Sequence, residues 1–226
     1  MLDQGTIRGW KHITKLDPDK SISDHGLAKV MDSGTDAVLV GGTLDVDRSK
    51  MTALVDKVLE YDIPVLMEPS SPENIVDRDG VSYFVPTVMN SATPDMIVGM
   101  HCKWAMSGFR DWDKVFPEAY IVLNPKSSVA KYTGANCDLT REQVVSYANV
   151  AQNYFRLPIV YLEYSGTFGD PSIVGDVSKS MNGKTALFYG GGIRDREKAM
   201  QMAEFATIIV GNVLYEDLEG FLQTVP

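Results

Sequence analysis

The chain has 226 residues, of which 44% are hydrophobic and 23% charged, a composition typical of a folded globular protein rather than a disordered one. Its formal net charge of −9 at pH 7 argues against a nucleic-acid partner, because binding a phosphate backbone requires a basic surface. The two cysteines, Cys102 and Cys137, lack metal-ligand spacing, and we find no signal peptide or membrane span. We therefore expect a single domain, residues 1–226, in a cytoplasmic protein.

Short apolar segments recur along the chain and predict eight β-strands. In chain order they read WKHITKL, AVLV, PVLM, SYFVP, YIVL, IVYLEY, ALFY and TIIV. Segments with helical periodicity lie between most of them, at residues 47–61, 95–109, 140–153 and 196–205. Continuously apolar strands that alternate with helices indicate a parallel sheet covered on both faces. Eight such units favour a closed (β/α)8 barrel, a TIM barrel, over the alternative of a doubly wound open sheet.

The third unit of the predicted barrel is irregular. Its connection, PSSPENIVDRDG at residues 69–80, is rich in Pro, Asp and Gly and too short for a full crossover helix. We therefore expect a modified barrel in which the third helix is missing or vestigial.

Polar residues follow the first two predicted strands, at the end where barrel active sites lie. Lys15 and Asp17 are two residues apart and so share one face of the first strand, and Thr43 follows the second strand. A carboxylate and a hydroxyl suit Mg²⁺, which also keeps waters and binds substrate phosphates, while Lys15 could supply a charge for phosphate. An ordinary surface ion pair is the alternative interpretation.

Apolar side chains recur at helical spacing in the segment after the fourth strand, namely Met96, Met100, Trp104 and Phe109. They would pack against the barrel as core, or line a groove for a long hydrocarbon chain. The sequence leaves both interpretations open.

The sixth predicted strand, IVYLEYSG, carries a carboxylate between two tyrosines. The two-residue period of a strand places Tyr161, Glu163 and Ser165 on one face, toward the mouth of the barrel. An unpaired buried charge is costly, so Glu163 is expected either to meet a substrate hydroxyl or to belong to a structural pair.

The last two predicted strands end in the glycine-containing segments YGGGIRD and VGN. Glycines there allow several backbone N–H groups to approach one anion, and the following helix N-termini add favourable dipoles. We therefore expect a phosphate site near Gly192, Gly211 and Asn212, although each segment by itself is also typical of a simple strand-to-helix turn. The three histidines form no metal cluster, and His12 is expected to be a core or rim residue.

The motifs KLDP, VGGT, VPTVMNS, GMH, YLEYSG, YGGGI and VGN occur in this order along nearly the whole chain. In this respect the sequence resembles the geranylgeranylglyceryl phosphate synthase and heptaprenylglyceryl phosphate synthase family. The resemblance implies a modified barrel that lacks one outer helix. It also implies Mg²⁺-dependent transfer of a prenyl group from a prenyl diphosphate to the free primary hydroxyl of sn-glycerol 1-phosphate, the first ether bond of a membrane lipid.

The resemblance also implies roles for individual residues. Asp17 and Thr43 would bind Mg²⁺, Glu163 would accept the hydroxyl proton, and the bulky Trp104 after GMH would close the prenyl groove and favour a C20 over a C35 donor. A homodimer and peripheral contact with membrane are implied as well. The residues expected to hold glycerol phosphate are Lys15, Tyr161, Leu162, Glu163, Tyr164, Ser165, Gly166, Gly192, Gly211 and Asn212.

Two other functions compete with this interpretation. A phosphoribosyl-type isomerase or synthase would share the phosphate site at the last two strands but lacks support from YLEYSG. A non-catalytic phosphate-binding barrel is the second alternative, and the joint presence of Lys15, Asp17, Thr43 and Glu163 argues against it.

Overall fold

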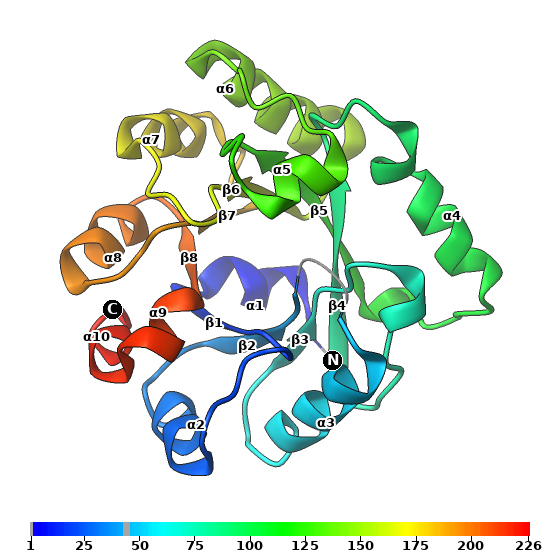
Figure 1. The fold of residues 1–226 in the computed structure, drawn as a ribbon. Coiled ribbons are helices and arrows are strands. Elements are labelled where there is room, and N and C mark those ends of the chain that lie inside the picture. The colour runs from blue at the N-terminus through cyan, green and yellow to red at the C-terminus, as the bar shows by residue number, and fades with distance from the viewer. Residues whose placement is uncertain (1, 43–45) are drawn as a thin grey trace.

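A computed structural model of the protein describes residues 2–42 and 46–226. Over these residues the eight parallel strands close into one barrel in sequence order, and β1 pairs with β8 to complete it (Figure 1). The prediction of a TIM barrel is thus confirmed, and the alternative of a doubly wound open sheet is wrong. The strands are β1 (His12–Leu16), β2 (Ala37–Val40), β3 (Val65–Met67), β4 (Val81–Val88), β5 (Val115–Val122), β6 (Ile159–Glu163), β7 (Ala186–Gly190) and β8 (Thr207–Val210).

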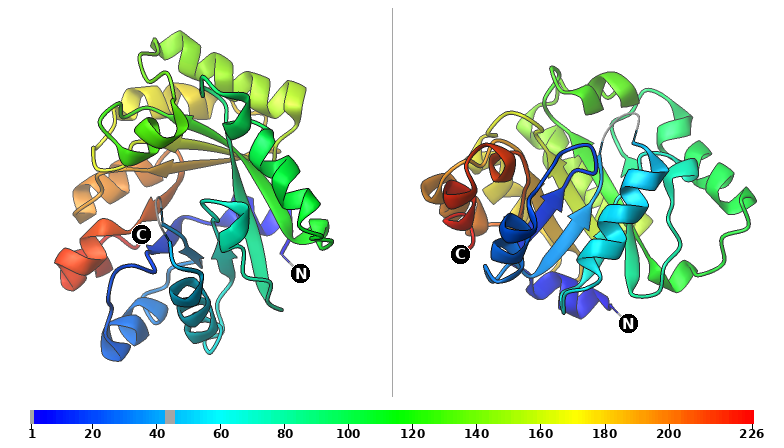
Figure 2. Two further views of the ribbon diagram at one scale, coloured as in Figure 1. Left: turned by 45° about the vertical axis from the view of Figure 1, so that its right-hand side comes forward. Right: turned by 60° about the horizontal axis from the view of Figure 1, so that its bottom comes forward.

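Helices surround the barrel, and α1 lies across its N-terminal end (Figure 2). A capping box between Thr140 and Gln143 defines the start of α6, whose last turn continues as a π-helix over Val150–Phe155. The helices are α1 (Gln4–Gly9), α2 (Asp24–Met31), α3 (Arg48–Val58), α4 (Gly99–Met106), α5 (Ser128–Thr133), α6 (Arg141–Asn149), α7 (Pro171–Ser180), α8 (Arg196–Ala203), α9 (Asn212–Glu216) and α10 (Leu218–Leu222).

The connection between β3 and β4 contains one 3₁₀ turn, Pro72–Asn74, and otherwise no helix in residues 68–80. The expectation of a vestigial third helix is therefore confirmed. Only β5 departs clearly from the predicted strands, since it begins at Val115, five residues before the YIVL segment. Pro117 and Glu118 interrupt its apolar pattern, yet both pair in register with β4.

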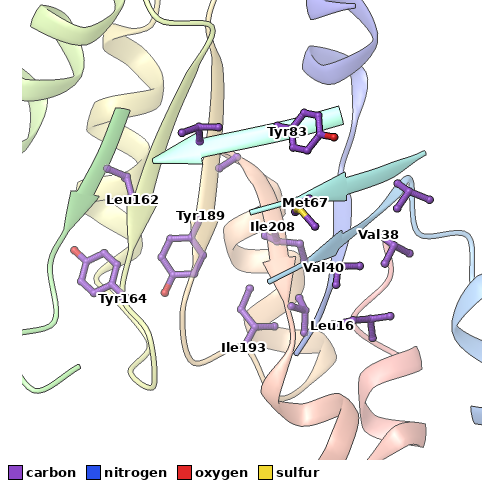
Figure 3. Close-up of a cluster of buried hydrophobic side chains, with 14 of the residues drawn as sticks. Leu16, Val38, Val40, Met67, Tyr83, Leu162, Tyr164, Tyr189, Ile193 and Ile208 are labelled. Carbon is purple, nitrogen blue, oxygen red and sulfur yellow. The ribbon is translucent and has the colours of Figure 1, made fainter. Parts of the chain in front are cut away.

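Side chains alternate between the inside of the barrel and the layer under the helices, as the two-residue period of a strand requires. In β2, Leu39 belongs to the inner cluster, whereas Val38 and Val40 belong to the outer one. Figure 3 shows part of the outer cluster, including Leu162, Tyr164, Tyr189 and Ile208. Inward-facing residues near the strand C-termini are therefore the ones that can reach a site at the barrel mouth.

His12 is fully buried in β1 and has polar partners on both ring nitrogens. Its Nδ1 lies 2.9 Å from the Thr35 hydroxyl and its Nε2 lies 3.2 Å from that of Thr224. The expectation of a core histidine is confirmed. Among the described residues, no helix combines the length and the apolar character needed to cross a membrane.

Candidate active site

Two adjoining cavities open at the C-terminal ends of the strands. The larger, here called the polar cavity, has a volume of about 630 Å³ and is bordered by β1, β6 and the segments that follow β7 and β8. The smaller, here called the apolar groove, has a volume of about 120 Å³ and runs toward α4 and the β3–β4 connection. Both are lined by Lys15, Gly42, Val129 and Ser165. A polar and a mainly apolar surface therefore meet at these four residues.

Lys15 forms an ion pair with Glu68, the residue directly after β3. Burial lowers the pKa of the Lys15 ammonium, but the charges of Glu68 and Glu163 outweigh it and raise the pKa above its usual value. Lys15 therefore stays positively charged at the floor of both cavities. The sequence prediction missed Glu68, although it is a polar residue at a strand C-terminus, the position where active-site residues are expected.

Glu163 is buried in β6 and lines the polar cavity. The Tyr120 hydroxyl donates a hydrogen bond of 2.8 Å to its Oε2, and Ser165 donates both its backbone N–H and its hydroxyl to Oε1. Within the described residues Glu163 forms no ion pair, so its partners are neutral donors that orient the carboxylate. Such a carboxylate, held rigidly at a cavity wall, is suited to accept a proton.

The motif residues 161–166 divide between the two sides of the strand. Tyr161 and Gly166 line the polar cavity with Glu163, and Gly190 leaves room for the Tyr161 ring, since a β-carbon added there would lie 2.1 Å from its hydroxyl. In contrast, Leu162 and Tyr164 belong to the outer cluster (Figure 3). Neither residue lines a cavity. Their side chains therefore support the site through packing, and only their backbone is available to it.

The glycine turn after β7 borders the polar cavity. Gly192 has a φ of +61°, and a β-carbon on it would lie 2.2 Å from the backbone nitrogen of Phe168, so only glycine fits there. The helix that follows does not begin at this turn, however: α8 starts at Arg196, and Asp195 caps it by accepting a hydrogen bond of 2.9 Å from the Lys198 N–H. The expectation that the N-terminus of α8 faces the anion is therefore wrong, because the Asp195 side chain already occupies that N-terminus.

The turn after β8 agrees with the expectation. α9 begins directly after Gly211, and within the described residues no side chain caps it. Gly211 approaches β1 closely, since a β-carbon there would lie 3.0 Å from the Lys15 carbonyl oxygen. The Asn212 side chain accepts a hydrogen bond of 2.9 Å from Lys20. The structure thus brings Lys15, Glu163, Gly192, Gly211 and Asn212 to one cavity.

Of the two predicted metal ligands, Asp17 lies at the polar cavity and Thr43 lies outside the described residues. The side chain of Asp17 projects toward Gly42, where an added β-carbon would lie 3.2 Å from its Oδ1. No group of three or more His, Cys, Asp or Glu residues within the described ranges could hold a metal ion. A single carboxylate at a cavity with room for a phosphate ester nevertheless fits Mg²⁺, which typically relies on one or two carboxylates and on substrate phosphates.

Trp104 combines both roles that the sequence left open. It lines the apolar groove together with Met96 and Met100, yet it is only 3% exposed. Its ring packs at centroid distances of 4.5 Å from Phe109 and 5.2 Å from Trp112. The indole is therefore a wall of the groove that is held in place by an aromatic cluster.

Comparisons with known proteins identify relatives along nearly the whole chain. The PcrB family matches residues 5–226. The chain is 45% identical to the geranylgeranylglyceryl phosphate synthase of Methanospirillum hungatei and 45% identical to the heptaprenylglyceryl phosphate synthase of Brevibacillus brevis, each match covering 96% of this chain and 95% of the relative.

A solved structure from Thermoplasma acidophilum has the same fold. This (S)-3-O-geranylgeranylglyceryl phosphate synthase, in complex with its substrate sn-glycerol-1-phosphate, superposes with a TM-score of 0.80 at 26% identity and covers 98% of this chain and 95% of its own. The resemblance inferred from the motifs, and with it the expectation of an enzyme, are confirmed. The chain belongs to the PcrB family.

Proposed function

We propose that this protein transfers a geranylgeranyl group from geranylgeranyl diphosphate to the C3 hydroxyl of sn-glycerol 1-phosphate. Prenyl transfer to glycerol phosphate is the activity named for its relatives. The observation in this structure that carries the proposal is the junction of a polar cavity with an apolar groove at Lys15 and Ser165. A phosphate ester and a prenyl chain would meet there, with Glu163 at the wall.

In the proposed reaction, glycerol phosphate lies in the polar cavity with its phosphate toward Gly192, Gly211 and Asn212. Its free hydroxyl faces Glu163, which takes the hydroxyl proton as the oxygen bonds to C1 of the prenyl chain. At the same time the bond between C1 and the diphosphate oxygen breaks. The hydrogen bonds from Tyr120 and Ser165 keep the Glu163 carboxylate aimed at the cavity throughout this step.

We also propose that Asp17, with Thr43, holds the Mg²⁺ ion. When bound, the ion would neutralise the negative charge of the departing diphosphate. The exposure of the Asp17 carboxylate to the polar cavity, beside the junction with the groove, supports this assignment.

The choice of the C20 donor rests on Trp104, whose buried ring forms a wall of the apolar groove. Sequence identity separates the two chain lengths only weakly, because two relatives named for the C20 product are 45% and 48% identical to this chain and two named for the C35 product 42% and 45%. A heptaprenyl donor is therefore the second candidate for the same reaction.

The decisive experiment is incubation with radiolabelled sn-glycerol 1-phosphate and prenyl diphosphates of several lengths, with and without Mg²⁺. We expect an organic-extractable product that forms fastest with the C20 donor, requires Mg²⁺ and does not form from sn-glycerol 3-phosphate. Binding of glycerol phosphate without any product would instead indicate a non-catalytic phosphate-binding barrel. A structure with bound phosphate or sulfate near Gly192, Gly211 and Asn212 would test the anion site separately.

A further inference from the structure

A buried carboxyl group lies beneath the candidate site and has no role in the reaction proposed above. Glu118 is in β5, is fully buried and lines neither cavity. Within the described part of the chain, neither of its carboxylate oxygens has a hydrogen-bond partner. An ionised carboxylate in such a place would be strongly unfavourable, and even a neutral one needs a partner for its O–H.

Glu68 offers the partner that Glu118 lacks. Its Oε2 binds the Lys15 ammonium, whereas its Oε1 is buried and without a hydrogen-bond partner among the described residues. Lys15, Glu68 and Glu118 come from β1, the end of β3, and β5, and alternate strands of such a barrel supply the side chains of one interior layer. One proton on Glu118, donated to Oε1 of Glu68, would satisfy both carboxyl groups.

The charges around Glu118 favour this protonated form. Burial, followed by the negative charge of Glu68, raises the pKa of the Glu118 carboxyl well above its usual range, while Lys15 lowers it and Glu163 raises it further. The other titratable groups that face it, Tyr120 and Tyr161, stay neutral because burial and the nearby carboxylates raise their pKa values well above 10. A protonated Glu118 also removes one negative charge from beneath the site, which favours the binding of two substrates that both carry phosphate groups.

We propose that Glu118 is a positioning residue that keeps its proton at neutral pH, donates it to Oε1 of Glu68, and so lets Lys15 turn from Glu68 toward a bound phosphate. Without this proton donor, the full charge of Glu68 would hold Lys15 in the ion pair, and phosphate would have to compete for the ammonium group. The inference rests on the proposed function, because it assumes that a phosphate enters the polar cavity.

Infrared spectroscopy of the purified protein tests the protonation without any need for turnover. We expect the C=O stretch of a protonated carboxylic acid at pH 7 in the wild type and its loss in Glu118→Gln. In Glu68→Gln the band of Glu118 should titrate at a lower pH than in the wild type, since the neighbouring negative charge is removed. A wild-type spectrum indistinguishable from that of Glu118→Gln in this region would overturn the proposal, as would an unchanged titration in Glu68→Gln.

Kinetics test the effect on Lys15. Glu118→Leu should raise the KM for sn-glycerol 1-phosphate about tenfold, with a smaller change in kcat, because it removes the proton donor of Glu68. Glu118→Gln, whose amide can still donate to Oε1, should recover most of this loss. Equal KM values in the Leu and Gln variants would contradict the positioning role. If no prenyl transfer is detected at all, the proposed function fails and the infrared result still decides the state of Glu118.

Discussion

Glu163 and Glu118 lie on neighbouring strands of the same barrel, yet their surroundings suit them to different tasks. Glu163 borders the polar cavity and receives hydrogen bonds from Tyr120 and Ser165. Glu118 is sealed below the site, with no donor directed at it in the described residues. Of the two, only Glu163 lines a cavity where it could meet a substrate hydroxyl, and its position is therefore the reason that we propose it, rather than Glu118, as the general base.

We expect Glu163→Gln to slow turnover by ~10²-fold or more, which is the usual contribution of a general base. The amide nearly preserves the shape of the side chain, so binding of glycerol phosphate should persist. Steady-state kinetics together with calorimetric titration of glycerol phosphate would measure both effects. Glu197→Gln, an exposed change on α8, is the matched control. Unaltered turnover in the Glu163 variant would remove this residue from the mechanism.

Trp104→Ala should raise activity with heptaprenyl diphosphate relative to geranylgeranyl diphosphate. Each methylene that enters a lengthened groove contributes about 0.8 kcal/mol, so opening the wall favours the longer donor by several such increments. The KM for glycerol phosphate should change little, because Trp104 does not line the polar cavity. The ratio of the two activities is the quantity to compare, since it does not depend on how much of the variant is folded.

The control for this experiment is Trp112→Ala. Trp112 packs against Trp104 in the same aromatic cluster but is 45% exposed and does not line the groove. It should therefore affect stability without changing the preference for donor length. If Trp104→Ala and Trp112→Ala give the same chain-length profile as wild type, Trp104 is only a core residue and the C20 assignment loses its support.

At the scale of elements, the β7–α8 connection places the predicted glycine, Gly192, at the polar cavity but begins its helix only at Arg196. Its glycines were expected to bring backbone N–H groups and a helix N-terminus to an anion. The structure gives Gly192 a second reason to be glycine, namely the close approach of the segment at Phe168, and Asp195 caps the helix. An anion at this turn must therefore depend on the backbone of the turn and on α9.

We expect Gly192→Ala to raise the KM for glycerol phosphate on the order of tenfold or more. Its left-handed φ alone costs a non-glycine residue about 1 kcal/mol, and the added carbon would also overlap the Phe168 backbone and displace the turn. Gly183→Ala is the matched control, because Gly183 has a φ of +72° with open space around it. It should lower stability slightly and leave KM unchanged. Similar KM values for both variants would show that the turn does not bind the phosphate.

At the scale of the whole molecule, His12 connects β1 to the segment before β2 through Thr35 and to the C-terminal segment through Thr224. Burial lowers the pKa of the His12 imidazole to about 4, with Asp36 partly opposing the shift. Between this value and the ordinary value near 6.5, the unfolded chain binds a proton that the folded protein does not. The contribution of His12 to the free energy of unfolding is therefore fully present above about pH 6.5, and it falls as the pH is lowered toward 4.

We expect this group to remove roughly 3 kcal/mol from the free energy of unfolding over that window. Urea denaturation of the wild type and of His12→Gln at several pH values would measure it, and the variant should lose this part of the pH dependence. The exposed His25, changed to Gln, is the control and should retain the wild-type slope. Equal slopes in wild type and His12→Gln would mean that His12 does not titrate as its burial implies.

The homodimer implied by the resemblance stays a prediction, which analytical ultracentrifugation of the purified protein would test.

The sequence by itself determined the eight strands, the vestigial third helix and the face of β6 that carries Glu163, because these depend on short-range periodicity and composition. Only the tertiary structure revealed the Lys15–Glu68 ion pair and the isolation of Glu118, since both depend on which strands face each other across the barrel. The placement of Leu162 and Tyr164 in the outer cluster, by contrast, follows from the two-residue period of β6. Local patterns specify which way a side chain points from its own strand. What that side chain meets is decided by the closure of the barrel, which brings residues more than 50 positions apart into contact.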